Sequence, residues 1–194
     1  LTFLDEVARQ KMRVRVMALF TVAEEAGLNG AIHLCMRKRI PAAARIVSIE
    51  TSRELPNARR GDGVVIRVGD IANIFHGGLI RFMVHAARAV ARREPGFRFQ
   101  RRLMDGGTCE SSVYQEFGHV TAGVCVPLGN YHNRNFARKK IGAEYVSVSD
   151  LVNMVRLFLG LVGELPEMER FVKRPKPGYR ERRGELGERM MERV

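Results

Sequence analysis

Two adjacent glutamates, Glu24 and Glu25, interrupt an apolar stretch and could do chemistry as a pair. The run ALFTVAEEAG passes from core-forming side chains to paired carboxylates with Thr21 as its only polar interruption. Burying two like charges side by side is costly unless a cation or a proton compensates them. On this pair alone two interpretations stand level: a cation-dependent site, or a surface turn in which both carboxylates are solvated.

Two further candidate ligands follow apolar strands. Glu50 ends the strand expected at residues 43–49, and His132 lies in the loop PLGNYHN, directly after another expected strand. In open α/β sheets the ends of adjacent parallel strands meet at one edge, where sites are built. Two carboxylates and an imidazole converging there suit zinc or a similar divalent ion. A third carboxylate would remain free to act as a base on a metal-bound water.

The other histidines fit structural roles better. His33 and His85 lie in expected helices, His119 precedes a strand, and none has a carboxylate at ligand spacing. His76, beside Gly77-Gly78, is the one that could still reach a site.

Apolar periodicity predicts the elements that must position these residues. The strands on either side of residues 31–39 form a strand–helix–strand unit, which predicts parallel pairing with a right-handed crossover. The string SVSD, from Ser147 to Asp150, has the spacing of a capping box at the start of a buried helix. The expected fold class is α/β, with a mixed, largely parallel sheet and flanking helices. Helices are expected over residues 1–11, 31–39, 78–93, 109–117 and 147–163, and strands over 14–21, 43–49, 64–68, 97–102 and 120–126.

Length and composition favour one domain that buries a core. The chain has 194 residues, of which 45% are hydrophobic, and no apolar run approaches the ~20 residues of a membrane span. Residues 1–165 are expected to form part of a catalytic domain, and the charged, glycine-interrupted residues 166–194 a mobile or loosely docked basic tail. Because the chain begins with Leu shortly before a strand-like segment, we expect an N-terminal part to be missing.

The cysteines and the net charge limit the classes of function. Three widely spaced cysteines without a CxxC motif, Cys35, Cys109 and Cys125, predict free buried thiols and a cytoplasmic protein. The net charge of +12 invites a nucleic-acid interpretation, but the excess is scattered and no RNA-binding aromatic signature accompanies it. A solvated basic surface is therefore favoured over specific nucleic-acid binding.

Four strings, in the order FTVAEEAGLNGA, GDGVVIRVGD, DGGTCESS and VCVPLGNYHN, point to a known family. Together they resemble the C-terminal half of the tetrahedral-type (glutamyl or deblocking) aminopeptidases, which are dinuclear zinc metallopeptidases. The resemblance covers Arg13 to Leu161, and the ordered set is far more specific than any one string. It implies a phosphorylase/hydrolase-like catalytic domain, here a partial one.

The resemblance also implies roles for individual residues. Glu24 would be the general base, and Glu25 would bind one metal together with His132. Glu50 would bind the second metal, at a position where the family usually has Asp. The cofactors implied are two divalent metal ions, zinc or else cobalt.

The resemblance also concerns a turn that would bind substrate and upstream metal ligands that this chain lacks. Gly106, Gly107 and Thr108 resemble an element that lines the active site, which implies substrate binding. The family also requires an upstream His-x-Asp segment and a bridging Asp before the glutamate pair. Only 23 residues precede Glu24, and they contain one Asp, Asp5, and no His. Those ligands would therefore lie outside this chain.

The function implied is a metal-dependent aminopeptidase that hydrolyses N-terminal peptide bonds through a water bridging two metals. The fragment alone would be inactive, and the full-length protein would be a homo-oligomer acting on peptides away from membranes. The main alternative is a degenerate, non-catalytic relative that serves as a binding or assembly subunit. An acylase or carboxypeptidase is disfavoured, because the 81 residues between Glu50 and His132 leave no room for a lid domain.

Overall fold

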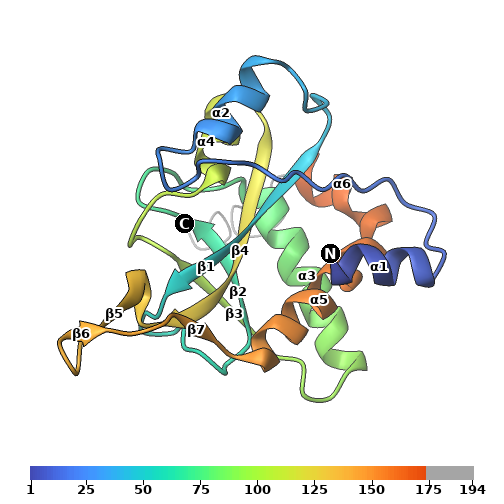
Figure 1. Ribbon diagram of the computed structural model, residues 1–194. Coiled ribbons are helices and arrows are strands. Elements are labelled where there is room, and N and C mark those ends of the chain that lie inside the picture. The colour runs from blue at the N-terminus through green and yellow to red at the C-terminus, as the bar shows by residue number, and fades with distance from the viewer. Residues whose placement is uncertain (174–194) are drawn as a thin grey trace, which may run out of the picture.

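The computed structural model describes residues 1–173, in which a five-stranded sheet lies between two groups of helices (Figure 1). β1 pairs in parallel with β4, β2 pairs in parallel with β3, and β2 and β4 are antiparallel. The predicted mixed, largely parallel sheet is therefore confirmed. The order across the sheet is β1 (Arg45–Arg53), β4 (Val120–Gly129), β2 (Val64–Gly69) and β3 (Phe99–Leu103), and short β7 (Tyr145–Val146) pairs with the end of β4.

The helices match the predicted ranges within a few residues. In Figure 1, α2 and α4 lie on one side of the sheet, and α3, α5 and α6 lie on the other. A short basic hairpin of two-residue strands extends from the end of the sheet. The bounds are α1 (Thr2–Arg9), α2 (Asn29–Met36), α3 (Gly77–Arg93), α4 (Glu110–Glu116), η1 (Tyr131–Asn133), β5 (Arg134–Asn135), β6 (Lys140–Ile141), α5 (Val148–Gly163) and α6 (Leu165–Lys173).

The two faces of the sheet differ in polarity because side chains alternate along each strand. Val64 and Ile66 of β2 join Val124 of β4 in the main core, which α3 and α5 cover. The opposite face carries polar side chains that α4 partly covers. Ser48 of β1, for example, shares a 2.7 Å hydrogen bond with Ser111 of α4. This polar face is the one that can carry a site.

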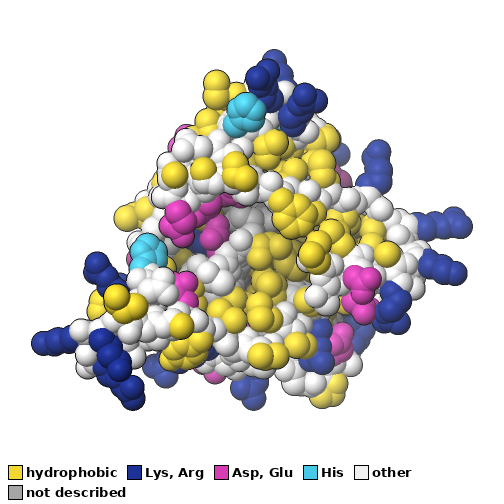
Figure 2. Space-filling view, viewed as in Figure 1, with side chains coloured by type: hydrophobic (Ala, Val, Ile, Leu, Met, Phe, Trp, Pro, Cys, Tyr) yellow, Lys and Arg dark blue, Asp and Glu magenta, His cyan; other side chains and the backbone are white. Residues whose placement is uncertain are grey.

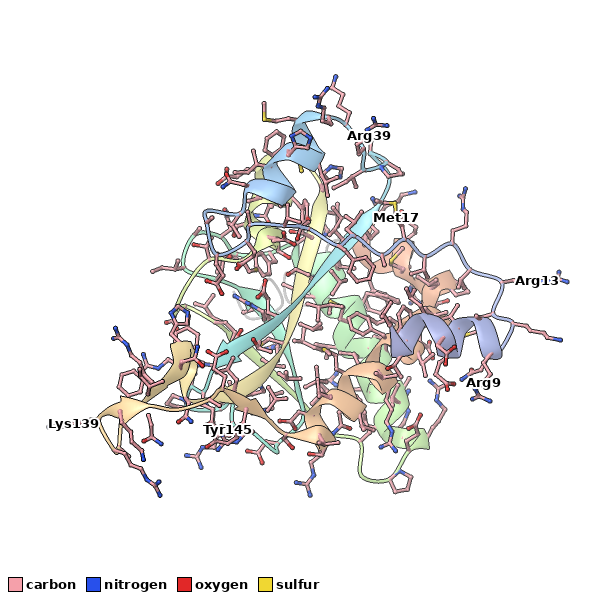
Figure 3. All side chains as sticks on the ribbon, viewed as in Figure 1. Arg9, Arg13, Met17, Arg39, Lys139 and Tyr145 are labelled. Carbon is pink, nitrogen blue, oxygen red and sulfur yellow. The ribbon has the colours of Figure 1, made fainter. Side chains whose placement is uncertain are left out.

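The strand predicted at residues 14–21 is absent. This segment is extended but belongs to no sheet, and Phe20, near its end, is 75% exposed instead of buried. Figure 2 shows apolar side chains open to solvent on this face, and Figure 3 shows Met17 on the segment. Apolar alternation favours extended backbone, but a strand also needs a neighbouring edge, and residues 15–21 form no backbone hydrogen bond with another segment of residues 1–173. The predicted parallel strand–helix–strand unit was therefore wrong.

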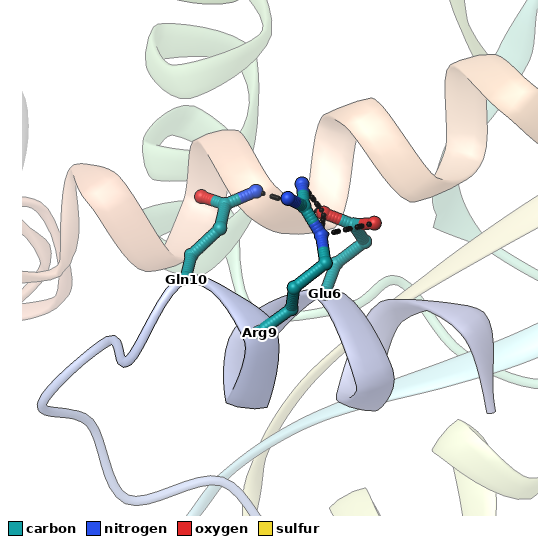
Figure 4. A network of polar contacts seen from close by, with 3 residues as sticks. All are labelled: Glu6, Arg9 and Gln10. Atoms are coloured by element: carbon teal, nitrogen blue, oxygen red, sulfur yellow. Dashed lines mark hydrogen bonds and ion pairs between the residues drawn. The ribbon is translucent and has the colours of Figure 1, made fainter.

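Helix α1 confirms the short helix predicted at the start of the chain. It packs on α5, where the rings of Phe3 and Phe158 lie 5.4 Å apart. On its outer side Arg9 donates to Glu6 at 2.7 Å and Gln10 donates to the same carboxylate at 3.0 Å (Figure 4). Ion pairs this exposed stabilise a fold little.

Glu50 does not end its strand as predicted. β1 continues to Arg53, and Glu50 lies opposite Cys125 of β4. The apolar run stops at Ile49 because residues 50–53 are all polar, although the backbone continues as a strand. The residues before and after Glu50 both pair with β4, so the backbone of Glu50 is held within the strand.

The capping box predicted at SVSD does not form. Helix α5 does begin after Ser147, but Ser147 makes no side-chain cap bond. Fully buried Asp150 instead accepts hydrogen bonds from the N–H groups of Gly61 at 2.7 Å and Gly63 at 2.9 Å. Gly63 has a φ of +97° and lies so close to the Arg98 carbonyl that no side chain would fit. Asp150 thus ties α5 to the loop before β2.

The beginning of the predicted tail forms helix α6. Phe171 packs against Phe82 and His85 of α3, with ring centroids 6.1 and 5.0 Å apart. Arg45 of β1 also pairs with Glu169 at 2.9 Å. Residues 174–194 lie outside the described residues, so the domain boundary at 165 stays a prediction.

Two compositional predictions can be compared with the structure. All three cysteines are free and buried, as predicted. Among residues 1–173, no helix is long and apolar enough to cross a lipid bilayer.

We predict that Asp150→Ala lowers the free energy of unfolding by about 2 to 4 kcal/mol, because two buried N–H groups lose a charged acceptor. Urea denaturation would measure this change. Exposed Asp62, in the same loop, provides the control, and Asp62→Ala should change stability by less than about 0.5 kcal/mol. Equal effects of the two substitutions would contradict the anchoring role of Asp150.

Candidate active site

Glu24 and Glu25 lie in a tight turn that leads into α2. Ala23, just before them, has a φ of +56°, and Gly27 has a φ of +102°. The carbonyl of Glu24 accepts hydrogen bonds from the N–H groups of Gly27 at 3.1 Å and Leu28 at 2.8 Å. The turn is therefore fixed by its own backbone, although the segment before it is not a strand. Glu24 is half-buried and Glu25 is exposed.

Glu50 lies half-buried on the polar face of the sheet, among other charged groups. Burial is the main cause that raises the pKa of Glu50 to about 7. The buried guanidinium of Arg67 opposes this shift, whereas Glu24, Glu110 and Glu25 add to it. The three carboxylates are therefore near enough for their charges to act on Glu50.

The charged groups that act on Glu50 also act on Glu24. Burial, followed by the charges of Glu25 and Glu110, raises the pKa of Glu24, whereas Arg67 and His132 lower it. The structure thus brings together the predicted residues Glu24, Glu25, Glu50 and His132, with Glu110 among them. We call Glu24, Glu25, Glu50 and Glu110 the acid cluster. Figure 2 shows acidic side chains gathered beside a hollow, with a histidine nearby.

His132 lies in a strained loop directly after β4. Asn130, His132 and Asn133 all have left-handed backbone conformations, with φ values of +55°, +55° and +58°. The N–H of His132 donates to Glu144 at 2.6 Å. Such conformations cost free energy in residues other than glycine, and they gather at functional sites.

The predicted substrate turn, Gly106 to Thr108, lies beside the same loop. A Cβ atom on Gly107 would lie 3.9 Å from the hydroxyl of Tyr131, the neighbour of His132. The carbonyl of Gly107 accepts a 3.3 Å hydrogen bond from the N–H of Ile71. The turn and the histidine loop therefore border the same space.

Buried Asp70 holds this turn in place. One carboxylate oxygen accepts from the N–H of Cys109 at 2.9 Å and from the hydroxyl of Ser112 at 2.7 Å. The other accepts from the N–H groups of Ala72 at 2.8 Å and Asn73 at 2.9 Å. Burial alone would raise the pKa of Asp70, but these hydrogen bonds together lower it below its usual value. Asp70 thus joins the end of β2 to the start of α4.

Glu110 is a site residue that the sequence interpretation missed. It is the first residue of α4, and one of its oxygens accepts from the hydroxyl of Tyr114 at 3.3 Å. Its other oxygen, Oε1, is buried without a hydrogen-bond partner. The available signal was its place in the string DGGTCESS, directly after the predicted substrate turn.

Arg67 is the second residue that was missed. It is only 4% exposed, donates from Nη1 to Ser52 of β1 at 3.3 Å, and has a buried Nε without a partner. Its side chain crosses β4 at Gly123, where a Cβ atom would lie 3.2 Å from the Arg67 Cδ. The available signal was a lone arginine inside the apolar strand VVIRVG.

Two other histidines serve the fold. The Nδ1 of His76 accepts from the N–H of Leu79 at 3.2 Å and so caps α3, and His85 lies 3.3 Å from Glu164. His76 is therefore used as a helix cap.

The chemistry of the acid cluster fits a divalent cation. The neighbouring carboxylates help to raise the pKa of Glu24 and of Glu50, an oxygen of Glu110 has no partner, and the imidazole of His132 could provide a nitrogen ligand. Within residues 1–173, however, no three His, Cys, Asp or Glu side chains are arranged to hold a metal ion. The cluster is therefore close enough for mutual repulsion but not for coordination, so it offers only part of a ligand set.

Comparison with protein families identifies the chain. The M42 glutamyl aminopeptidase family matches residues 1–157. The chain belongs to this family. A comparison with curated proteins gave no match.

Solved structures of aminopeptidases share the fold of this M42 chain. The TET1 peptidase of Pyrococcus horikoshii is 22% identical with a TM-score of 0.65, and the match covers 83% of this chain and 44% of that one. A TET aminopeptidase from a marine-sediment Thaumarchaeota archaeon is 21% identical, with a TM-score of 0.58, over 78% and 41% of the two chains. An aminopeptidase of Desulfurococcus kamchatkensis is 23% identical, with a TM-score of 0.57, over 81% and 44%. The chain spans less than half the length of each.

We predict that Asp70→Asn lowers the free energy of unfolding by about 2 to 3 kcal/mol at pH 7, because the hydrogen bonds lose a charged acceptor. The native pKa of Asp70 lies below its usual value, so its stabilisation is complete above that value and is lost as the pH falls through the native pKa. The difference between wild type and variant should therefore shrink on acidification. Urea denaturation at pH 7 and at low pH would measure it.

Asp105→Asn, which alters an exposed carboxylate near the same turn, is the control and should be almost neutral. A difference between Asp70→Asn and wild type that stayed constant with pH would contradict the assigned charge of Asp70.

Proposed function

We propose that this chain supplies the general base and part of the metal-binding site of a metal-dependent aminopeptidase that hydrolyses N-terminal peptide bonds. The observation that carries the proposal is the meeting of Glu24, Glu25, Glu50 and His132 around one polar sheet face, in a chain of this family. Solvated surface carboxylates would have no reason to converge against their mutual repulsion.

Glu25, Glu50 and His132 are the residues that would hold divalent metal ions, with zinc as the first choice and cobalt as the second. Such ions, when bound, supply a Lewis acid that activates water and polarises the scissile carbonyl. Glu50 stands where the family usually has Asp, and its extra methylene places the carboxylate further from the strand. This difference bears on how closely the metal can be held.

Glu24 would act as the general base. Its raised pKa makes the carboxylate a better proton acceptor than an ordinary surface glutamate. It would take a proton from the attacking water and return it to the leaving nitrogen. The turn from Gly106 to Thr108, beside Tyr131, would align the peptide backbone.

The whole enzyme would need ligands from a part of the family-length protein that this chain does not contain. The related solved chains are more than twice as long as the portion matched here. The Pyrococcus horikoshii peptidase is described as assembling into a tetrahedron or a large octahedral shell. By analogy, we propose that the family-length protein forms a homo-oligomer and acts on peptides. A cytoplasmic location stays a prediction.

We predict that the 194-residue chain alone binds zinc weakly and hydrolyses aminoacyl substrates poorly or not at all, because its ligand set is partial. Isothermal titration with zinc would measure the binding. Two tight sites on this chain would overturn the prediction.

In a family-length version, we predict that Glu24→Gln lowers kcat by about 10²-fold or more while the metal content is retained, because the proton acceptor is lost. Kinetics with aminoacyl anilides, together with metal analysis, would test it. Glu116→Gln, at an exposed glutamate on α4, is the matched control and should leave kcat unchanged. Full activity in Glu24→Gln would rule out its role as base, and an inactive wild type with two bound metals would favour a non-catalytic relative.

A further inference from the structure

A basic hairpin, residues 134–141, follows the His132 loop directly. It consists of β5, a turn and β6, and it carries four cations and no acidic residue: Arg134, Arg138, Lys139 and Lys140. All four side chains are exposed, and none takes part in an ion pair among the described residues. Figure 3 shows Lys139 at the outer end of this projection. Four unpaired cations in eight residues repel one another, so the hairpin is a natural anion contact.

The hairpin is fixed to the site at its base. The N–H of Gly142 donates to the carbonyl of Asn133 at 3.0 Å, and the Nδ2 of Asn130 donates to the carbonyl of Ala143 at 2.7 Å. The 2.6 Å hydrogen bond from the N–H of His132 to Glu144 closes the same base. These bonds tie the hairpin and the His132 loop together, so the position of the cations is linked to the position of the histidine.

A contact with β1 adds a further link. The guanidinium of Arg53, at the end of β1, lies 5.9 Å from the centre of the Phe136 ring in the hairpin. This is a cation–π distance. Since β1 also carries Glu50, the hairpin is tied to both strands that place the candidate ligands, and Arg53 adds a fifth cation beside it.

The site and the hairpin therefore form two neighbouring regions of opposite charge. The acid cluster suits the free amino group of a peptide, and the hairpin suits carboxylates further along the same peptide. The hairpin begins at Arg134, two residues after His132, so an extended peptide that passes His132, advancing about 3.3 Å per residue, can reach its cations. We propose that the basic hairpin recognises acidic side chains that follow the scissile bond, which makes acidic peptides the preferred substrate class. This inference rests on the proposed function for the direction in which the peptide lies.

A binding experiment tests the inference without any turnover. The probe is the peptide Ala-Asp-Glu-Asp-Glu with a fluorophore at its C-terminus, compared with Ala-Asn-Gln-Asn-Gln. Fluorescence anisotropy with the 194-residue chain at low salt should show tighter binding of the acidic peptide, and added salt should remove the difference because exposed charges are screened. Because no hydrolysis is measured, failure of the proposed base or metal ligands would leave this result unaffected.

The variant R138Q/K139Q/K140Q should weaken binding of the acidic peptide by about tenfold. Each exposed ion pair contributes at most about fivefold and usually less, and the variant removes three such pairs at once. The matched control is R37Q/K38Q/R39Q, which removes three consecutive exposed cations after α2. Figure 3 shows Arg39 far from Lys139. The control should change binding by less than about twofold.

A charge reversal keeps the inference falsifiable if neutralisation merely disturbs the hairpin. R138E/K139E/K140E should lose the acidic peptide and gain binding to Ala-Lys-Arg-Lys-Arg. Equal losses in the hairpin variant and the control, or equal binding of acidic and neutral peptides by wild type, would overturn the inference. Hairpin-dependent binding of a short DNA duplex that exceeded binding of the acidic peptide would also overturn it, in favour of a nucleic-acid contact.

Discussion

The burial of carboxylates beside one another, next to the polar face of the sheet, is the constraint on which the rest of the site depends. Glu24 and Glu50 have raised pKa values because burial and neighbouring carboxylates both disfavour their ionised forms. Arg67, buried beneath them, opposes part of this repulsion but forms no ion pair with them among residues 1–173. An arrangement that keeps like charges together at this cost needs a cation or a proton to complete it.

The surrounding fold holds its buried charges with backbone hydrogen bonds. Asp70 accepts from three N–H groups and one hydroxyl, and Asp150 accepts from two N–H groups. Each carboxylate joins segments that are far apart in the sequence: β2 to the turn before α4, and α5 to the loop before β2. Hydrogen bonds to a charged acceptor are stronger than neutral ones, so these aspartates position loops that contribute no strand or helix pairing of their own.

The scattered basic residues and the charged groups at the site have different roles. The net charge of +12 gives no direction by itself, because most of the basic side chains are spread over the surface. At the site, however, the basic hairpin directly follows His132, whose charge acts on Glu24 of the acid cluster. A peptide has an ammonium group at its N-terminus and can carry carboxylates further along. Such a ligand is recognised by neighbouring surface regions of opposite charge, and not by the net charge of the chain.

The sequence by itself determined the elements whose stability is local, and tertiary structure decided those that need a distant partner. The apolar stripe of α3 and the run of β2 predicted both elements. The motifs identified Glu24, Glu25 and His132, and Glu50 was found from its place after an apolar run; the roles of all four remain predictions. The strand expected at residues 14–21 failed because extended backbone requires a neighbouring edge for its hydrogen bonds. Glu110 and Arg67 were invisible as site residues for a related reason: a charge acquires its function from burial and from neighbours, which only packing brings together.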